Sequence, residues 1–418
     1  MSQKPKLYNF AAIVIAIVAT AAFAGDWPNF HGPDRTNKSR ETGLLTSWPQ
    51  GGPTLLWSAS GAGAGYSGVS VADGVIYTAG SKSSANYVFA YDLTGKPLWE
   101  RRVGAEWEAS GSFSFARAYQ GSRGTPTVSG GMVYYLSDRG NLVALDAKTG
   151  AERWSVDVHR RYETTIPVYG YSESPLVIGD RLYVAVFGKK HTVVCFNRNN
   201  GNVIWEGGHV GGNGGFSSLV PIESAGVKQL VSFTADFLFG VSVENGSVLW
   251  TVPVRNSHGL NCTDIIYHDG HVFASSGYGF GSMLVKLSAG AGGRVTAEQV
   301  YKTDLMDNHH GGIVFHNGHV YGGSHRRGWF CLDFRTGRQM WNAPGKGSIV
   351  FAENMLYLYD EEGKMSLVKA QPGSFETVSS FEVPSGGRGA YWAHPAISNG
   401  VLYLRHADKI FAYDIKRR

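Results

Sequence analysis

Two basic residues and one tryptophan in this chain could bind a flat, negatively charged organic molecule. Arg123 and Lys346 can donate charge-assisted hydrogen bonds to carboxylates, and Trp392 offers a large aromatic face for stacking. His310 and His394 add imidazoles, which bind ligands, metals or protons near neutral pH. We hypothesise that these five residues line one binding site. The alternative is that they only solvate a water-filled channel or contact a protein.

Two carboxylates and a further histidine could add metal or acid–base chemistry. Glu173 and Asp264 are of the type that binds calcium or abstracts a proton, and they are our candidates for both roles. His309 directly precedes His310, so the pair could act as metal ligands or as acid–base groups, and its role stays open. Because adjacent residues on a strand point to opposite faces, we expect at most one of the two imidazoles to face the site.

A repeat along the chain could bring these distant residues together. The stretch from Asp146 to Gly150, followed by Trp154, has the pattern of a strand, a glycine turn and a second strand. Such units recur at a mean interval of about 46 residues, which is typical of the four-stranded blades of a β-propeller. We assign the glycines and tryptophans to packing between blades and not to chemistry. The other clear copies carry Gly95 with Trp99, Gly201 with Trp205, Gly246 with Trp250, and Gly337 with Trp341.

The hairpins in these units predict an all-β fold, an eight-bladed propeller of four-stranded antiparallel blades over residues 54–418. The last unit ends near Tyr413 without a fourth strand, and residues 54–57 have no hairpin before them. The N-terminal strand should therefore complete the last blade and close the ring. The innermost strands of a propeller start at the central channel, which is the default binding site. The equivalent starting positions are Tyr66, Arg123, Ser172, Ser217 or Ser218, Cys262, His310, Lys346 and Trp392.

The first 24 residues have the features of a secretory signal peptide. Two lysines precede an apolar run that ends in Ala22-Phe23-Ala24, so we expect cleavage near Ala24 and a periplasmic or extracellular protein. The run of about 15 apolar residues is shorter than a membrane span, and we expect no span. Residues 25–53 are rich in aromatic residues and proline, which predicts a segment that packs across one face of the propeller.

The charge balance and the cysteines argue against several classes of protein. The chain carries 38 basic and 33 acidic residues, and its last three residues are its only basic run, so we expect no nucleic-acid binding. Its three cysteines are widely spaced, which argues against a disulfide or zinc framework. The sequence has no nucleophile elbow, phosphate loop or zincin motif, so motifs leave open whether the protein is an enzyme.

The Asp-x-x-Thr-Gly-x-x-x-Trp units resemble the pyrroloquinoline quinone (PQQ) type repeat, and the chain after residue 24 resembles the PQQ-like β-propeller family. One branch of that family, the quinoprotein dehydrogenases, implies PQQ, calcium and an aspartate base for the oxidation of alcohols or sugars. A second branch, similar to the assembly factor BamB, implies protein binding without a cofactor. The Trp392-Ala393-His394-Pro395 string resembles secreted, mostly uncharacterised members.

We predict a secreted or periplasmic binding or interaction module, a monomer, that uses its channel mouth to bind a protein or a small anionic or polymeric ligand. The alternative prediction is a PQQ-dependent dehydrogenase. In that case Arg123 and Lys346 pair with quinone carboxylates and Trp392 stacks on the quinone. Glu173 or Asp264 then helps to bind calcium and to abstract a proton.

Overall fold

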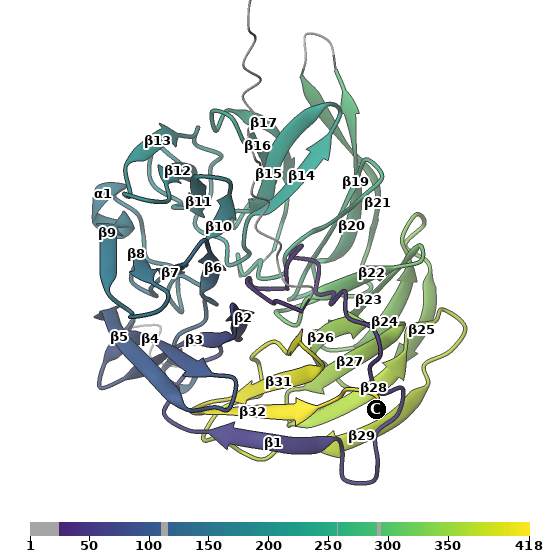
Figure 1. Cartoon of the computed structure of the whole chain (residues 1–418). Helices are drawn as coiled ribbons and strands as arrows, with labels where there is room; N and C mark the ends of the chain where they lie inside the picture. The colour runs from purple at the N-terminus through teal and green to yellow at the C-terminus, as the bar shows by residue number, and fades with distance from the viewer. Residues whose placement is uncertain (1–24, 110–115, 257, 291–293) are drawn as a thin grey trace, which may run out of the picture.

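Eight four-stranded antiparallel sheets are arranged as blades around a central axis (Figure 1). The structure is a computed structural model that describes residues 25–109, 116–256, 258–290 and 294–418, so the predicted signal peptide lies outside the described residues. The predicted all-β, eight-bladed propeller is confirmed. A single helical turn, α1 (Val158–Arg161), follows the second blade.

Blades one to four follow one another along the chain. Blade one holds β2 (Ser70–Ala72), β3 (Val75–Lys82), β4 (Ala85–Asp92) and β5 (Pro97–Ala105); blade two holds β6 (Thr127–Ser129), β7 (Met132–Leu136), β8 (Asn141–Asp146) and β9 (Glu152–Asp157); blade three holds β10 (Leu176–Ile178), β11 (Arg181–Ala185), β12 (Val193–Asn197) and β13 (Val203–Glu206); blade four holds β14 (Val220–Ser224), β15 (Val227–Phe233), β16 (Phe237–Ser242) and β17 (Val248–Pro253).

Blades five to eight complete the ring. Blade five holds β18 (Ile266–His268), β19 (His271–Ser276), β20 (Gly281–Ala289) and β21 (Val295–Thr303); blade six holds β22 (Ile313–His316), β23 (His319–Ser324), β24 (Gly328–Asp333) and β25 (Gln339–Ala343); blade seven holds β26 (Gly347–Ala352), β27 (Met355–Asp360), β28 (Lys364–Lys369) and β29 (Thr377–Glu382); blade eight holds β30 (Ala396–Ser398), β31 (Val401–His406), β32 (Lys409–Asp414) and β1 (Thr54–Ala59).

The N-terminal strand closes the ring as predicted. β1 pairs antiparallel with β32, with Thr54 opposite Asp414 and Leu55 opposite Tyr413. The two ends of the propeller are thereby hydrogen-bonded within one blade, and β32 has no free edge.

The repeated tryptophan and glycine join each blade to the next. Trp99 of blade one donates from Nε1 to the Ala147 carbonyl of blade two at 3.0 Å. Its ring lies on Gly150, where an added Cβ would stand 2.6 Å from the indole. Gly150 also has φ +69°, which side chains disfavour. The same contact joins Trp57 to Gly95, Trp154 to Gly201 and Trp205 to Gly246, and Tyr301 takes the place of tryptophan against Gly337.

Replacing Gly150 with alanine should therefore destabilise the propeller by about 2–4 kcal/mol, from the positive φ together with the collision with Trp99. Gly131→Ala is the matched control, because Gly131 has φ +74° but no atom within 4 Å of an added Cβ. We expect that control to lose only about 1–2 kcal/mol. Urea denaturation of both variants checks this, and equal losses would show that the indole contact contributes nothing.

Residues 25–53 cross the ring before joining blade eight, as the purple segment in the middle of Figure 1 shows. Trp27 bridges to Val71 of blade one, and Lys38 bridges to Phe351 of blade seven. Between these two points, the side chains of His31 and Arg35 are buried at the axis, each about 3% exposed. The segment therefore brings its own residues to the place where the inner strands meet.

Candidate functional site

The inner ends of the blades surround a cavity of about 480 Å³. Each blade contributes one residue from the position at which its inner strand approaches the axis. The predicted ligand residues Arg123, Lys346, Trp392, His310 and His394 all line this one cavity. The structure thus brings together five side chains that are up to 271 residues apart in sequence. Their role in binding a ligand stays a prediction. The eight ring positions are Tyr66, Arg123, Ser172, Phe216, Cys262, His310, Lys346 and Trp392.

In blade four, the predicted ring residue is wrong. Phe216 lines the cavity, whereas Ser217 and Ser218 are buried behind it. Ser217 exchanges a hydrogen bond with Ser232 at 2.9 Å, and Ser218 Oγ accepts from the Ser174 amide at 3.0 Å. The prediction failed because the hairpin of β14 and β15 is longer than the first hairpins of the other blades. Counting a fixed number of residues back from the end of the hairpin therefore does not reach the ring position in this blade.

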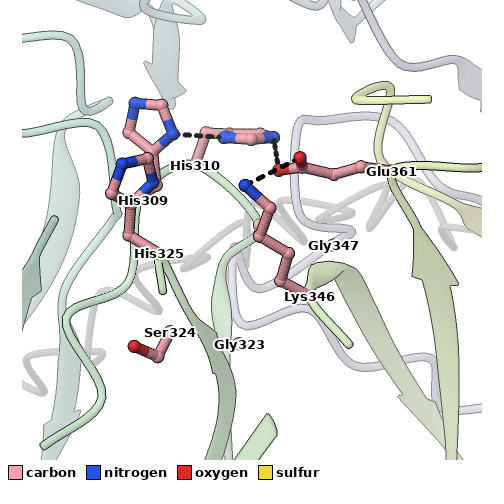
Figure 2. A pocket seen from close by; sticks show the side chains of 9 residues that line it. His309, His310, Gly323, Ser324, His325, Lys346, Gly347 and Glu361 are labelled. Carbon is pink, nitrogen blue, oxygen red and sulfur yellow. Dashed lines mark hydrogen bonds and ion pairs between the residues drawn. The ribbon is translucent and has the colours of Figure 1, made fainter. Parts of the chain in front are cut away.

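His309 and His310 both line the cavity, contrary to the expectation for neighbours on a strand. They lie in the loop before β22, where side chains do not alternate. Their Nδ1 atoms are 3.1 Å apart, and His309 Nε2 lies 3.1 Å from the Tyr278 hydroxyl. His325 packs against His309 with ring centroids 4.7 Å apart, so three imidazoles gather beside the cavity (Figure 2).

Burial keeps these imidazoles neutral. Desolvation, together with the nearby cationic groups, lowers the pKa of His309 to about 3 and that of His310 well below its ordinary value. Burial also lowers the pKa of His394 to about 3. At neutral pH these residues can exchange hydrogen bonds with a ligand but contribute no charge.

Lys346 and Glu361 form an ion pair on the same wall. Lys346 Nζ lies 2.9 Å from Glu361 Oε2, and Glu361 Oε1 lies 3.7 Å from His310 Nε2 (Figure 2). Glu361 was not among the predicted residues, because it lies in the turn after β27 and outside the ring position. With the histidines neutral, Arg123 and Lys346 against Glu361 leave one net positive charge in the lining of the cavity.

Arg123 is held rigidly at the cavity rim. Its guanidinium donates to the carbonyls of Gly121 and Tyr169, at 3.1 and 2.7 Å, and to that of Tyr119. It also lies 5.4 Å from the Tyr66 ring centre and 5.3 Å from that of Tyr169. Arg123 therefore positions the aromatic wall, and part of its donor capacity is already used there.

The remaining wall is aromatic. Trp392 stacks on Tyr119 with centroids 5.3 Å apart and planes at 13°, and it contacts Tyr66 at 4.9 Å. Tyr119 and Tyr169 come from loops between blades and Tyr278 comes from the turn between β19 and β20, so no periodic signal in the sequence points to them. Phe30, from the N-terminal segment, also lines the cavity. The site is thus an aromatic box with a few polar groups, as is usual for small-molecule sites.

Comparison with known proteins shows which family this propeller belongs to. Residues 85–343 match the PQQ-repeat family described as outer membrane protein assembly factor BamB. The chain belongs to this family. Among curated relatives of this PQQ-like propeller, quinoprotein alcohol dehydrogenase PedH of Pseudomonas putida is 23% identical over 70% of the chain and 47% of its own length. The chain thus spans about half the length of that relative.

Solved structures share the fold of the PQQ-like propeller. BamB from Moraxella catarrhalis superposes with a TM-score of 0.59 at 17% identity, over 87% of this chain and 98% of its own. A europium-containing methanol dehydrogenase gives a TM-score of 0.62 at 14% identity, over 92% of this chain and 90% of its own. At these identities the likeness shows a common architecture only.

A second layer of residues, two places beyond the ring positions, joins blades one to five of this PQQ-like propeller near the axis. In blades two to five, the side chain at this position accepts a hydrogen bond from the backbone amide at the same position of the preceding blade. The acceptors are Thr125 Oγ1 for Gly68, Ser174 Oγ for Thr125, Ser218 Oγ for Ser174 and Asp264 Oδ1 for Ser218, at distances of 2.7–3.0 Å. Asp264 therefore occupies a position at which the side chain joins two neighbouring blades.

The residues at this layer do not fit a calcium ion. Glu173 and Asp264 are buried, 2% and 4% exposed, and neither lines the cavity. Asp264 Oδ2 lies 3.1 Å from His31 Nδ1, and both carboxylates attract the buried guanidinium of Arg35. Across the described ranges, no group of three or more His, Cys, Asp or Glu side chains is arranged to hold a metal. The Arg35 guanidinium and the His31 imidazole of the same chain therefore lie beside the predicted calcium ligands.

Proposed function

We propose that the protein is a binding module whose ligand site is the axial cavity. The observation that carries this proposal is the convergence of Arg123, Lys346, Trp392, His310 and His394 on one cavity whose volume is in the range of small-molecule sites. The aromatic box and the net positive charge favour a flat or ring-containing anion. The family described as an assembly factor supports a role in binding.

We also propose that the module works outside the cytoplasm, after cleavage of the predicted signal peptide near Ala24. None of the helices in the described ranges is long and apolar enough to cross a membrane.

Titration calorimetry with PQQ, a flat tricarboxylate, against citrate, a tricarboxylate without a ring, tests the proposed site. We expect PQQ to bind and citrate to bind at least tenfold more weakly, because only the former can use the aromatic wall. Trp392→Leu and Lys346→Met should each weaken PQQ binding by about tenfold, which corresponds to about 1.4 kcal/mol. Lys148→Met, on an exposed outer turn, is the control and should leave affinity unchanged. No PQQ binding at millimolar concentration, or equal losses in all three variants, would reject this site.

A second candidate function is that of a quinoprotein dehydrogenase, which the similarity to PedH favours. The engagement of Glu173 and Asp264 with Arg35 and His31 speaks against its calcium-dependent form. Dye-linked oxidation of alcohols and aldoses, measured with PQQ and calcium, separates the two functions. Turnover would establish the dehydrogenase, and PQQ binding without turnover would favour the module.

A further inference from the structure

Arg35 is the most deeply buried cation of the N-terminal segment. We propose that it is a resident organic cation at the propeller axis, filling the place that Glu173 and Asp264 would otherwise offer to a metal ion. The axis is then complete without metal. This inference concerns the layer behind the cavity and does not depend on which ligand the cavity binds.

The guanidinium is fixed by the inner ends of three consecutive blades. Nη1 donates to the carbonyls of Ser174 and Leu219 at 3.1 and 3.3 Å. Nη2 donates to the Pro175 carbonyl and lies 3.4 Å from Thr127 Oγ1. These contacts hold the cation next to the backbone that carries Glu173, so its position is set by the ring and not by a flexible side chain.

Each of the two carboxylates uses one oxygen to accept a hydrogen bond from a backbone amide. Glu173 Oε1 accepts from the Ala185 amide at 2.7 Å, and Asp264 Oδ1 accepts from the Ser218 amide at 2.7 Å. Within the described residues, Glu173 Oε2 has no hydrogen-bond partner, and Asp264 Oδ2 lies 3.1 Å from His31 Nδ1. Two buried acids require a neighbouring positive charge to stay ionised, because burial alone strongly disfavours the charged form.

Arg35 supplies that charge at every physiological pH. Burial lowers its pKa to about 10, while the attraction of Asp264 and then Glu173 opposes this shift, so the side chain stays protonated. Burial raises the pKa of Glu173 well above its ordinary value, and Arg35 acts against this. A divalent or trivalent cation at the same acids would meet the repulsion of a guanidinium that cannot lose its proton.

His31 of the N-terminal segment contacts the second acid. His394 Nε2 donates to the His310 carbonyl at 2.7 Å, so the neutral His394 presents Nδ1 as an acceptor. His31 Nε2, 3.1 Å from that Nδ1, must therefore carry a proton. His31 Nδ1 lies 3.1 Å from Asp264 Oδ2, so an imidazole of the N-terminal segment already contacts the second oxygen of this acid. Glu173 Oε2 has no such contact among the described residues.

Metal binding to the purified protein and to Arg35→Met tests the proposal. The native protein should show no saturable binding of calcium or terbium at the axis below 1 mM, by calorimetry and terbium luminescence. Arg35→Met should gain a site at least 100-fold tighter, which Glu173→Gln removes again, and calcium should raise its melting temperature. Arg153→Met, which removes a surface charge paired with Asp146, is the control and should gain no site. Tight native binding that Glu173→Gln abolishes would overturn the proposal, as would a folded Arg35→Met that binds no metal.

A stability measurement keeps the proposal testable if Arg35→Met folds poorly. Removing the buried guanidinium, with its hydrogen bonds to three carbonyls, should lower the melting temperature by about 5–10 °C. Adding Glu173→Gln to Arg35→Met removes the unbalanced charge, so the double variant should recover at least half of that loss, whereas Glu173→Gln alone should destabilise the native protein. Additive losses in the double variant would show that the two charges are not coupled and would overturn the proposal.

Discussion

Replacing Arg405 with methionine should lower the free energy of unfolding by about 3–5 kcal/mol, because several buried carbonyls would lose their donor at once. Arg405 lies on β31 and is 1% exposed. Its Nη2 donates to the carbonyls of Ala62 and Gly63 at 3.1 and 3.0 Å. Its Nη1 donates to Thr78 Oγ1 at 2.6 Å and to the carbonyls of Ser67 and Ala79. These groups join blade eight to blade one.

Urea denaturation at pH 7 measures this loss. Burial lowers the pKa of Arg405 to about 10, so the guanidinium is still charged under these conditions. Arg405→Lys keeps the charge but loses the fork of donors, and we expect it to recover less than half of the stability. Arg153→Met controls for the removal of an arginine at the surface. A loss below 1 kcal/mol in Arg405→Met would mean that closure of the ring depends on β1 alone.

Acid should destabilise the propeller well above the pH at which its carboxylates titrate. The pKa of His309 and that of His394 are both about 3 in the folded protein, against about 6.5 in an unfolded chain. Between these two pKa values, the unfolded state therefore binds two protons that the folded state does not bind. Stability is complete above pH 6.5 and falls as the pH drops from 6.5 towards 3. Allowing for partial solvent access, we expect the two residues to cost about 2–4 kcal/mol between pH 6.5 and 4.5.

Urea midpoints at pH 7, 5.5 and 4.5 check this prediction. His309→Gln and His394→Gln should each flatten the pH dependence, because glutamine takes up no proton in either state. His319→Gln, at the half-buried start of β23 and outside the cavity lining, is the control. Glu173 acts in the opposite direction, since its raised pKa lets the folded protein take up a proton first. An identical pH dependence in all variants would contradict the assignment to the axial histidines.

The repeat made the architecture predictable, whereas site residues at irregular positions of the repeat could not be predicted from it. Gly150 and Trp154 recur because the tryptophan of each blade packs on the glycine of the next, and a contact repeated at every junction gives a periodic signal in the sequence. The same periodicity located seven of the eight ring positions and failed only at Phe216, where one hairpin is longer. Both carboxylate candidates proved to be buried behind the cavity.

Residues outside the repeat could not be found in this way. Tyr119 comes from a loop between repeats, so its contact with Trp392 depends on a chain path that has no periodic signal. Arg35 and Arg405 resemble surface arginines in sequence, because the partners of their guanidinium groups are mostly backbone carbonyls. A backbone carbonyl carries no mark of its own in the sequence.

The path of residues 25–53 has a consequence for how the protein forms. His31 contacts His394 across 363 residues of chain, so the N-terminal segment cannot be buried until the residues around His394 have been synthesised. Contacts of such large sequence separation form slowly, and their unpaired strands and apolar surfaces are prone to aggregate meanwhile. A chain truncated before blade eight lacks β30–β32, so its aromatic N-terminal segment stays exposed and the axis cannot form. We expect truncated products to be degraded or aggregated and not to accumulate as partial propellers.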